Sequence, residues 1–458
     1  MNKSSILIIL LRLTLLFIPL IFSLTLTQAQ NKPTNASTDS IRTTRLQDVE
    51  VTSKAALTSK TVLSTEATGS PASVSLVGRD YIAKQSVLSY GDLLRPLAGI
   101  NVANYQLGGV GYGIEMRGYT TTEHARDVAF FIDGVPQNQG SSIQTNGYTD
   151  LNPFIPENIR RIEVIRGPFS PFYGDHALGG AISFETEDKQ PSSITLSAGT
   201  FGTVRGLGTF GFGQNNSTGY VSLEGGSTDA YRNNNAEKHL NGIAKYAFPL
   251  WDGIASVRAQ AYGSNFGSAG YLTRSDIDAG MVSPKSAIES SDGGTTRQQN
   301  LVFNYKGADS SKFTSATLYV QHHDFIRIRS RAVNGPQKEE RDNRTWYGAD
   351  LRRTRITTLG NIPALFAIGL SFRVDVIDNT AFATAKRQII SQQEDKQINT
   401  FTPAAYAQMQ LRPTARLKVT LSGRYDYLFY NIKTGSIDGD TANLNSTPHT
   451  GFLVQRQV

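Results

Sequence analysis

The sequence has no cysteine in its 458 residues, which excludes a disulfide scaffold and any metal site built on thiolates. It has only two tryptophans, and only 18% of its residues carry a charge. Beyond the N-terminal segment no run of about 18 apolar residues occurs, which excludes a domain of membrane-crossing helices. Glycine (42), tyrosine (19) and phenylalanine (22) are abundant instead. This composition favours a β-rich, turn-rich protein, and the length exceeds one ordinary soluble core.

Basic residues are in excess, with a net charge of +7, but they are scattered and form no dense run. We therefore expect no nucleic-acid partner. His322-His323-Asp324 is similar to a metal cluster, but neighbouring side chains on a strand point to opposite faces. The glycine-rich run 108–113 lacks the Lys-Ser/Thr of a phosphate-binding loop. The sequence predicts neither an enzyme nor a bound metal or cofactor.

Residues 1–29 are typical of a secretory signal peptide. Lys3 supplies the positive start, an apolar stretch follows over 6–26, and Thr27-Gln28-Ala29 offers small residues for cleavage after Ala29. The alternative is a membrane-spanning anchor, because the apolar stretch is just long enough to cross a bilayer. Arg12 and Pro19 within the stretch favour the cleaved signal.

Residues 30–59 are mostly small and polar, which indicates a linker. One short alternating strand stands in it, with Val49 and Val51 on one face and Asp48, Glu50 and Thr52 on the other. A lone strand is not stable by itself and presents unpaired backbone groups to the sheet edge of a partner. The alternative is that this segment is the first strand of the domain that follows.

The run 158–184 is the most informative part of the chain. Ile162 and Val164 alternate with Arg161 and Glu163, which predicts a half-buried strand. A glycine turn, a double glycine and a second short strand at 181–184 follow. Glycines at such positions allow positive φ or a close backbone approach. The run is a compact β-rich unit and not a catalytic motif.

Four further motifs precede this run in a fixed order. They are the segments 92–100 (DLLRPLAGI), 114–118 (IEMRG), 128–136 (VAFFIDGVP) and 150–156 (DLNPFIP). Together the five motifs resemble the plug domain of TonB-dependent outer-membrane receptors, although the usual Pro-Gly is here Ala98-Gly99. We place this domain at 60–187, with a strand at 73–77 and helices at 80–84 and 89–95. Its structural motif comprises Arg117, Gly118, Asp133, Gly134, Arg166, Gly167, Tyr173, Gly174, Gly179 and Gly180.

From residue 188 onward, strands of about ten residues alternate between an apolar and a polar face, which is typical of a membrane β-barrel with a wet lumen. In 364–376, for example, Ile368 and Leu370 oppose Gly369, Ser371 and Arg373. Similar alternation occurs in 405–412 and 416–429. A soluble β-sandwich or β-helix is the alternative, which the strand length and the signal peptide disfavour.

The predicted fold class is a membrane β protein: an antiparallel transmembrane barrel with an N-terminal α+β plug in its lumen. We expect about 12 strands in 188–458, whereas a lumen that holds such a plug needs about 22. The C-terminal residues 455–458 also lack the aromatic-terminated closing strand usual in this family. Because an open sheet edge in lipid leaves backbone groups unpaired, we expect an incomplete receptor. A 12-stranded barrel with the plug outside is the alternative.

The resemblance implies a location in the outer membrane of a Gram-negative bacterium and import of a scarce ligand. The family's usual ligands are ferric siderophores, with cobalamin, haem and glycans as others; a passive porin or adhesin is the rival class. The arm would be the TonB box, contacting TonB and its inner-membrane energy-transducing complex through Leu46, Gln47, Asp48, Val49, Glu50, Val51 and Thr52.

The resemblance also implies roles inside the lumen. Arg117 and Arg166 would pair with glutamates of the barrel wall that this sequence does not place. Two plug loops would face the ligand, through Tyr105, Gln106, Tyr112, Gln137 and Asn138. Long loops near 264–297 and 326–342 would be extracellular. There Arg327, Arg329 and Arg331 would meet an anionic ligand or the phosphates of lipopolysaccharide.

Overall fold

The computed structural model describes residues 72–456, apart from residues 86, 88, 106–108, 120–125, 334, 415, 436–441 and 446–448. The predicted signal peptide, the strand at 46–52 and Gln106 lie outside the described residues. All described residues belong to one unit of the chain, Thr52–Val458.

Residues 72–186, here called the plug domain, contain a five-stranded sheet with the strand order β1-β6-β7-β4-β5. β4 and β7 run parallel, and the other neighbours in this sheet are antiparallel. A two-stranded sheet of β2 and β3 accompanies it. The elements are β1 (Ser73–Gly78), α3 (Arg79–Lys84), α4 (Tyr90–Leu94), β2 (Ile100–Ala103), β3 (Gly113–Met116), β4 (Val128–Ile132), β5 (Val135–Pro136), η1 (Pro156–Asn158), β6 (Ile159–Arg166) and β7 (Gly180–Thr186).

One apolar core holds the plug sheet and its helices together. Ser89 and Asp92 form a capping box at the start of α4, which turns Leu93 and Leu94 into this core. Ile162 and Val164 enter the same core from β6. The other face of β6 was expected to be exposed, but Glu163 is only 1% exposed. A second cluster, which includes Tyr173 and Ala177 of the following loop, covers that face of the sheet.

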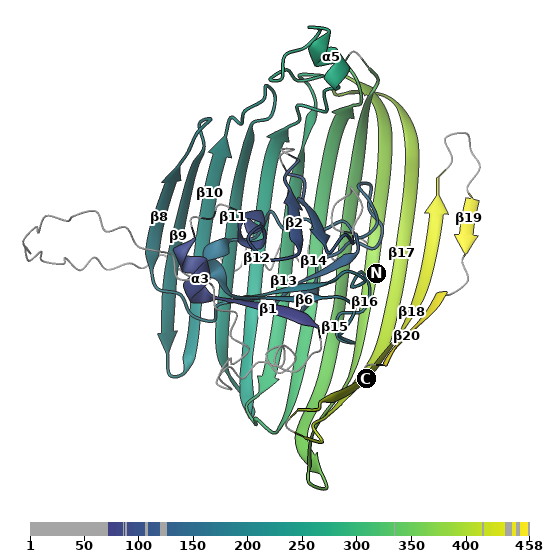
Figure 1. The fold of residues 1–458 in the computed structure, drawn as a ribbon. Helices are drawn as coiled ribbons and strands as arrows, with labels where there is room; N and C mark the ends of the chain where they lie inside the picture. Colours follow the sequence, from purple (N-terminus) through teal and green to yellow (C-terminus); the bar gives the residue numbers. More distant parts are fainter. Residues whose placement is uncertain are drawn as a thin grey trace, which may run out of the picture. The chain divides into compact units, whose positions relative to one another are not determined.

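A 13-stranded sheet follows, in which every strand pairs antiparallel with its neighbours. Figure 1 shows the strands from β8 to β18 side by side in sequence order. The strands are β8 (Ser193–Ala198), β9 (Val204–Gln214), β10 (Ser217–Thr228), β11 (Glu237–Leu250), β12 (Gly253–Gly267), β13 (Gly293–Gly307), β14 (Lys312–Ser330), β15 (Gln337–Leu359), β16 (Ile362–Ala385), β17 (Gln388–Leu411), β18 (Val419–Thr434), β19 (Ala442–Asn445) and β20 (His449–Arg456).

The two faces of this sheet differ as the alternation predicts. On β16, Ile368 and Leu370 are 62% and 64% exposed, whereas Ala367, the preceding residue on the opposite face of the strand, is buried. Stacked aromatic rings lie on the exposed face, where Phe210 and Phe212 of β9 and Tyr246 of β11 form a row that spans β10. An exposed apolar face and an opposite face of polar side chains are what a lipid-facing wall requires.

The sheet is an up-and-down meander in which β9–β10, β11–β12, β15–β16 and β16–β17 are joined by two-residue turns and the other connections are longer. β9 and β10 are joined by Asn215 and Asn216, whose positive φ values of 53° and 65° make a tight hairpin turn. The longest connection, 268–292, carries the helix α5 (Arg274–Asp278). The long loop expected at 326–342 was wrong, because β14 and β15 pair as far as Ser330 and Gln337. Where a strand continues beyond the apolar band its residues are polar, and such a sequence was therefore predicted to be a loop.

The sheet is open in the described part of the chain. There β8 pairs only with β9, and β19 and β20 both pair with β18, so the sheet is a partial barrel. The expectation of about 12 strands is close to the 13 observed. Among the described residues no helix is both long and apolar enough to span a membrane.

Candidate functional site

The plug domain contacts one face of strands β8–β18, here called the wall, and this interface is the candidate functional site. The β4–β5 hairpin shows how local sequence builds it. Asp133 and Gly134 have φ values of 49° and 81°, which is the tight mirror-image turn that Asp-Gly favours. The Asp133 carboxylate accepts hydrogen bonds from the Thr186 amide and hydroxyl, both at 2.8 Å. It also lies 2.8 Å from Nε of Arg258 on β12.

Asp133 and Arg258 are both buried, with side chains 7% and 2% exposed. Burial by itself raises the pKa of Asp133, but Lys245, Arg258 and the Thr186 hydrogen bonds outweigh it and hold that pKa below its usual value. The carboxylate is therefore charged at neutral pH and pairs the hairpin with the wall.

A second ion pair joins η1 to β9. Both terminal nitrogens of Arg205 donate to the Glu157 carboxylate, at 2.6 and 2.8 Å. Arg205 Nε donates to Glu224 on β10, at 3.1 Å, and His239 on β11 contacts the same carboxylate oxygen. Beside this pair, Ile155 packs against the wall residues Leu207 and Ile243.

β11 and β12 hold the plug at further points. Lys245 Nζ donates to the Thr186 hydroxyl at 2.8 Å and forms an ion pair with Asp188, also at 2.8 Å. Asn241 donates to the carbonyl oxygen of Pro153 at 2.7 Å, and Gln260 donates to the same oxygen. These strands therefore bind both charged and backbone groups of the plug.

A buried polar network connects the plug to β13 and β14. Gln298 donates to Asp150 at 2.8 Å, and Gln139 hydrogen-bonds His323 at 2.9 Å. His323 also contacts Thr296 at 3.1 Å. Burial raises the pKa of Asp150 to about 7, although its hydrogen bonds from Asn152 and Gln298 oppose the shift. This carboxyl therefore titrates near physiological pH.

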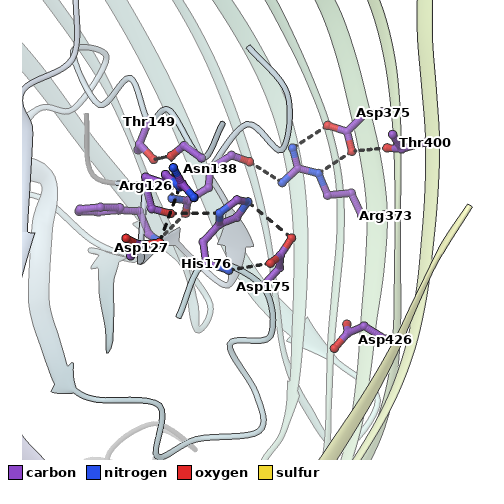
Figure 2. Close-up of polar contacts among 12 residues, drawn as sticks. Arg126, Asp127, Asn138, Thr149, Asp175, His176, Arg373, Asp375, Thr400 and Asp426 are labelled. Atoms are coloured by element: carbon purple, nitrogen blue, oxygen red, sulfur yellow. Dashed lines mark hydrogen bonds and ion pairs between the residues drawn. The ribbon is translucent and has the colours of Figure 1, made fainter. Parts of the chain in front are cut away.

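On β16 and β18 arginines reach backbone carbonyls of the plug. Arg373 donates to the carbonyl oxygen of Asn138 at 2.8 Å and forms two hydrogen bonds with Asp375 (Figure 2). Arg424 donates to the carbonyl oxygen of Pro171 at 3.3 Å and is held by Asp426 in the same way. Each arginine is thus oriented by an aspartate two residues further along its own strand.

The plug loop 171–177 lies against this part of the wall. His176, with φ of 63°, contacts the carbonyl oxygen of Arg126 at 3.1 Å and lies beside Asp175 (Figure 2). Phe172 packs against Ala367 and Tyr406, with its ring edge-on to that of Tyr406. The guanidinium of Arg352 lies 3.8 Å from the centre of the Phe172 ring.

A cavity of about 860 Å³ lies between the plug domain and the wall. Its plug side comes from the β4–β5 hairpin, β7 and the loop 172–176, and its wall side mostly from β13–β18. Aromatic rings, arginines and aspartates line it, among them Phe172, Tyr319, Tyr430, Arg352, Asp350, Arg373, Asp375, Arg424 and Asp426. Within the described residues no group of three or more His, Asp or Glu side chains is arranged to hold a metal ion.

The residues predicted as the plug's structural motif occupy turns and close contacts. Positive φ values occur at Gly118, Gly134, Gly167, Gly174 and Gly180. A Cβ on Gly180 would lie 2.1 Å from the Ile165 carbonyl oxygen, and one on Gly179 would lie 2.8 Å from Cβ of Tyr119. Tyr173 is buried, with its ring 5.0 Å from that of Phe131.

Arg117 and Arg166 lie together around Gly99, against which both side chains pack. Arg166 is buried and donates to the carbonyl oxygen of Ala98 at 2.7 Å and to Ser75 Oγ at 2.9 Å. Its Nη2 has no hydrogen-bond partner among the described residues, and burial together with Arg117 lowers its pKa. Arg117 is exposed. The wall glutamates expected to pair with them stay a prediction.

Four of the five residues predicted to contact ligand lie in the described part of the chain, and their side chains pack within or beside the plug. Tyr112 stacks on Tyr90 at 4.8 Å, and Tyr105 packs beside Tyr148. Asn138 binds the Phe130 amide and the carbonyl oxygens of Val128 and Gly147. Gln137 donates to the Val135 carbonyl oxygen at 2.9 Å. Their binding role stays a prediction.

The three arginines expected at the extracellular end have separate environments. Arg327 is buried and donates to Gln144 of the plug, and Arg329 pairs with Glu340 on β15. Arg331 is exposed. Next to this region, His322 and His323 lie on opposite faces of β14, where His322 contacts Thr345 and His323 faces the plug.

Sequence reasoning missed the wall residues that hold the plug: Arg205, Lys245, Arg258, Arg373 and Arg424. A signal was available for two of them, because Arg373-Val374-Asp375 and Arg424-Tyr425-Asp426 place opposite charges two residues apart on the lumenal face of a strand. For the other three, the partners lie far away in the chain. Only the fold brings them together.

Comparison with known proteins identifies similar sequences and similar folds. Residues 66–181 match a family model described as the TonB-dependent Receptor Plug Domain. A hemin receptor of Yersinia enterocolitica is 26% identical over 308 residues, which cover 63% of this chain and 42% of that protein. The chain thus spans about two fifths of the length of this curated relative.

Solved structures of outer-membrane receptors share the fold. The ferric citrate transporter FecA in its unliganded form matches with a TM-score of 0.71 at 15% identity, over 83% of this chain and 59% of FecA. The ferric yersiniabactin uptake receptor FyuA from Yersinia pestis matches with a TM-score of 0.65 at 16% identity, over 84% of this chain and 60% of FyuA.

Proposed function

We propose that this chain, which belongs to the TonB-dependent outer-membrane receptors, forms the plug and part of the barrel of a transporter. In this proposal the transporter actively imports a scarce ligand. Receptors of this family lie in the outer membrane of Gram-negative bacteria. A ferric siderophore is the first candidate for the ligand.

The observation that supports this proposal is the docking of a folded plug domain on one face of the wall through ion pairs, such as the buried Asp133–Arg258 and the partly buried Glu157–Arg205. A plug held in this way blocks passive diffusion of a bulky solute, so transport needs work. The outer membrane has no nucleotide supply and no useful ion gradient. In this proposal the work arrives through residues 46–52, which add a strand to a sheet of TonB, itself driven by its inner-membrane complex.

Haem is the second candidate ligand, because the curated relative is a hemin receptor. Cobalamin and glycans remain alternatives, and a passive porin or an adhesin is the rival class. A porin needs neither a plug nor an arm. We propose no enzymatic activity, because the family that the chain matches consists of receptors and transporters.

Deletion of residues 46–52 tests the proposal, with deletion of the neighbouring seven residues 53–59 as the matched control. Cells that depend on this receptor would be grown under iron starvation with ferric citrate, a ferric catecholate or haemin as the iron source. We expect growth on at least one probe to be lost in the first deletion and kept in the second. Unchanged growth of the first deletion on every probe that supports the parent would indicate a passive pore.

Contact with lipopolysaccharide is part of the same proposal. Arg331 is exposed beyond the end of β14 and suits a phosphate group. Replacement of Arg331 by Gln should weaken binding of purified lipopolysaccharide to the detergent-solubilised receptor. Unchanged binding would remove this contact from the proposal.

A further inference from the structure

The plug is attached to the two flanks of the wall by different kinds of contact. On β9, β11 and β12, arginine or lysine side chains form ion pairs with carboxylates that belong to the plug or follow it directly. These pairs are Arg205–Glu157, Lys245–Asp188 and Arg258–Asp133. We call β9–β12 the anchored flank. Lys245 and Arg258 meet these carboxylates only while the plug is docked, whereas Arg205 also pairs with Glu224 of the wall at 3.1 Å.

On β16 and β18 the charges are matched within the wall itself. Arg373 pairs with Asp375 at 2.7 Å, and Arg424 pairs with Asp426 at 2.7 Å. Toward the plug, these arginines donate only to backbone carbonyl oxygens, those of Asn138 and Pro171. We call β16–β18 the neutral flank.

This difference makes the two flanks unequally costly to separate from the plug. Separation at the anchored flank leaves a buried Arg258 and a buried Asp133 each without a counter-ion, which is costly in a poorly hydrated interface. Separation at the neutral flank breaks one hydrogen bond for each arginine, and water replaces it once the plug has moved. The guanidinium groups keep their aspartates throughout.

The cavity extends along the neutral flank. Arg373, Asp375, Arg424 and Asp426 all line it, together with Leu428, Tyr430 and Ile432 of β18. Asp133, Asp188 and Lys245 of the anchored flank line it as well, whereas Arg205, Glu157 and Arg258 do not. A small outward movement at the neutral flank therefore enlarges an existing space.

We propose that the plug pivots on β9–β12 and opens along β16–β18, so that the cavity widens into the path of the solute. This inference rests on the proposed function, in which the plug has to open, but it does not depend on the identity of the ligand.

Cross-linking of one flank at a time tests the proposal, and the absence of cysteine makes the chain a ready background. On the anchored flank, I155C and I243C replace two residues in contact. On the neutral flank, F172C and A367C do the same. A short bismaleimide bridges each pair in the receptor purified from the outer membrane. The readout is potassium chloride conductance across a planar bilayer during urea-induced opening of the plug.

We expect the bridge at the neutral flank to reduce the urea-induced conductance at least tenfold, and the bridge at the anchored flank to change it less than twofold. Equal suppression by both bridges, suppression only at the anchored flank, or no suppression by either would overturn the proposal. Each pair without the reagent serves as its own control. If one pair does not assemble, I155C with L207C and F172C with Y406C span the same contacts.

Because the probe is a simple salt, the test needs neither the ligand nor TonB. If the conductance test contradicts the pivot, the import proposal is unaffected. Conversely, failure of the deletion at 46–52 to block growth would leave the conductance result unaffected. The two proposals can therefore fail separately.

Discussion

Replacement of Asp133 by Asn should loosen the plug on the anchored flank without disturbing the hairpin. Asn adopts positive φ readily and keeps an oxygen for the Thr186 amide, so the tight turn persists. The change removes the counter-ion of Arg258, whose side chain is 2% exposed. Breaking a buried pair by removing one partner typically costs about 3–5 kcal/mol. Because Thr186 still bonds the new side chain, we expect about 3 kcal/mol.

Trp346 provides the assay. It is buried in contact with Val135 at the end of the same hairpin, whereas Trp251 is 83% exposed at a turn. In a W251F background, the fluorescence of Trp346 reports undocking of the plug during urea titration. With a slope of about 1–2 kcal/mol per molar urea, a loss of about 3 kcal/mol lowers the midpoint by about 2 M. The exposed Asp175 supplies the control D175N, which should leave the midpoint unchanged.

A double-mutant cycle makes the reasoning refutable. R258Q alone should also destabilise docking, and D133N with R258Q should cost about 2 kcal/mol less than the sum of the single changes. The pKa of Asp133 is lowered, so its contribution is present above the unfolded-state value of about 3.9 and is lost as the pH falls through the folded value. Strict additivity at pH 7.5, or a midpoint for D133N close to that of the parent, would contradict the assigned ion pair.

Three further predictions concern the rest of the interface. Burial raises the pKa of Asp150 to about 7, so docking should be stronger at pH 5.5 than at pH 8.5, by about 2 kcal/mol; D150N should remove this pH dependence of the urea midpoint, and its persistence would assign it to another group. G174A should weaken docking by about 1–2 kcal/mol and so lower the same midpoint, because φ is 60° and a Cβ would lie 2.6 Å from Nε of Arg424. G140A, whose Cβ would meet open space, should leave the midpoint unchanged. R166Q removes the hydrogen bonds to Ala98 and Ser75 and should sensitise cells to vancomycin, whereas R126Q at an exposed site should not; equal sensitivity of both would argue against a role in holding the plug.

The β-rich architecture could be predicted from the sequence because it depends on local rules. A period of two in apolar residues specifies which face of a strand meets lipid, and Ile368 and Leu370 lie on that face as expected. The tight turn at Asp133-Gly134 follows equally from the conformational preferences of two residues. The five motifs in order were enough to identify the plug, since each is a contiguous segment.

Local rules failed where polar strands continue past the apolar band. The segment 326–342 was read as a loop, although Arg329 pairs across to Lys338 in an antiparallel ladder. They also failed for Glu163, which alternation places on a wet face but which the loop around Tyr173 covers. Both errors have one cause. Strand pairing and burial by a distant segment can involve polar residues, and the polarity of a residue does not predict either.

The interface itself was decided by tertiary structure. Nothing in the sequence links Asp133 to Arg258 or Glu157 to Arg205, because the matched charges lie on segments far apart in the chain. The pairs Arg373–Asp375 and Arg424–Asp426 are local and visible in the sequence, but their meaning depends on which flank of the plug they face. The sequence alone thus determined the two domains, the strands and their lipid-facing side, through short-range propensity and periodicity. Only the tertiary structure decided where ion pairs join the plug to the wall and where they do not, because these pairs are long-range contacts.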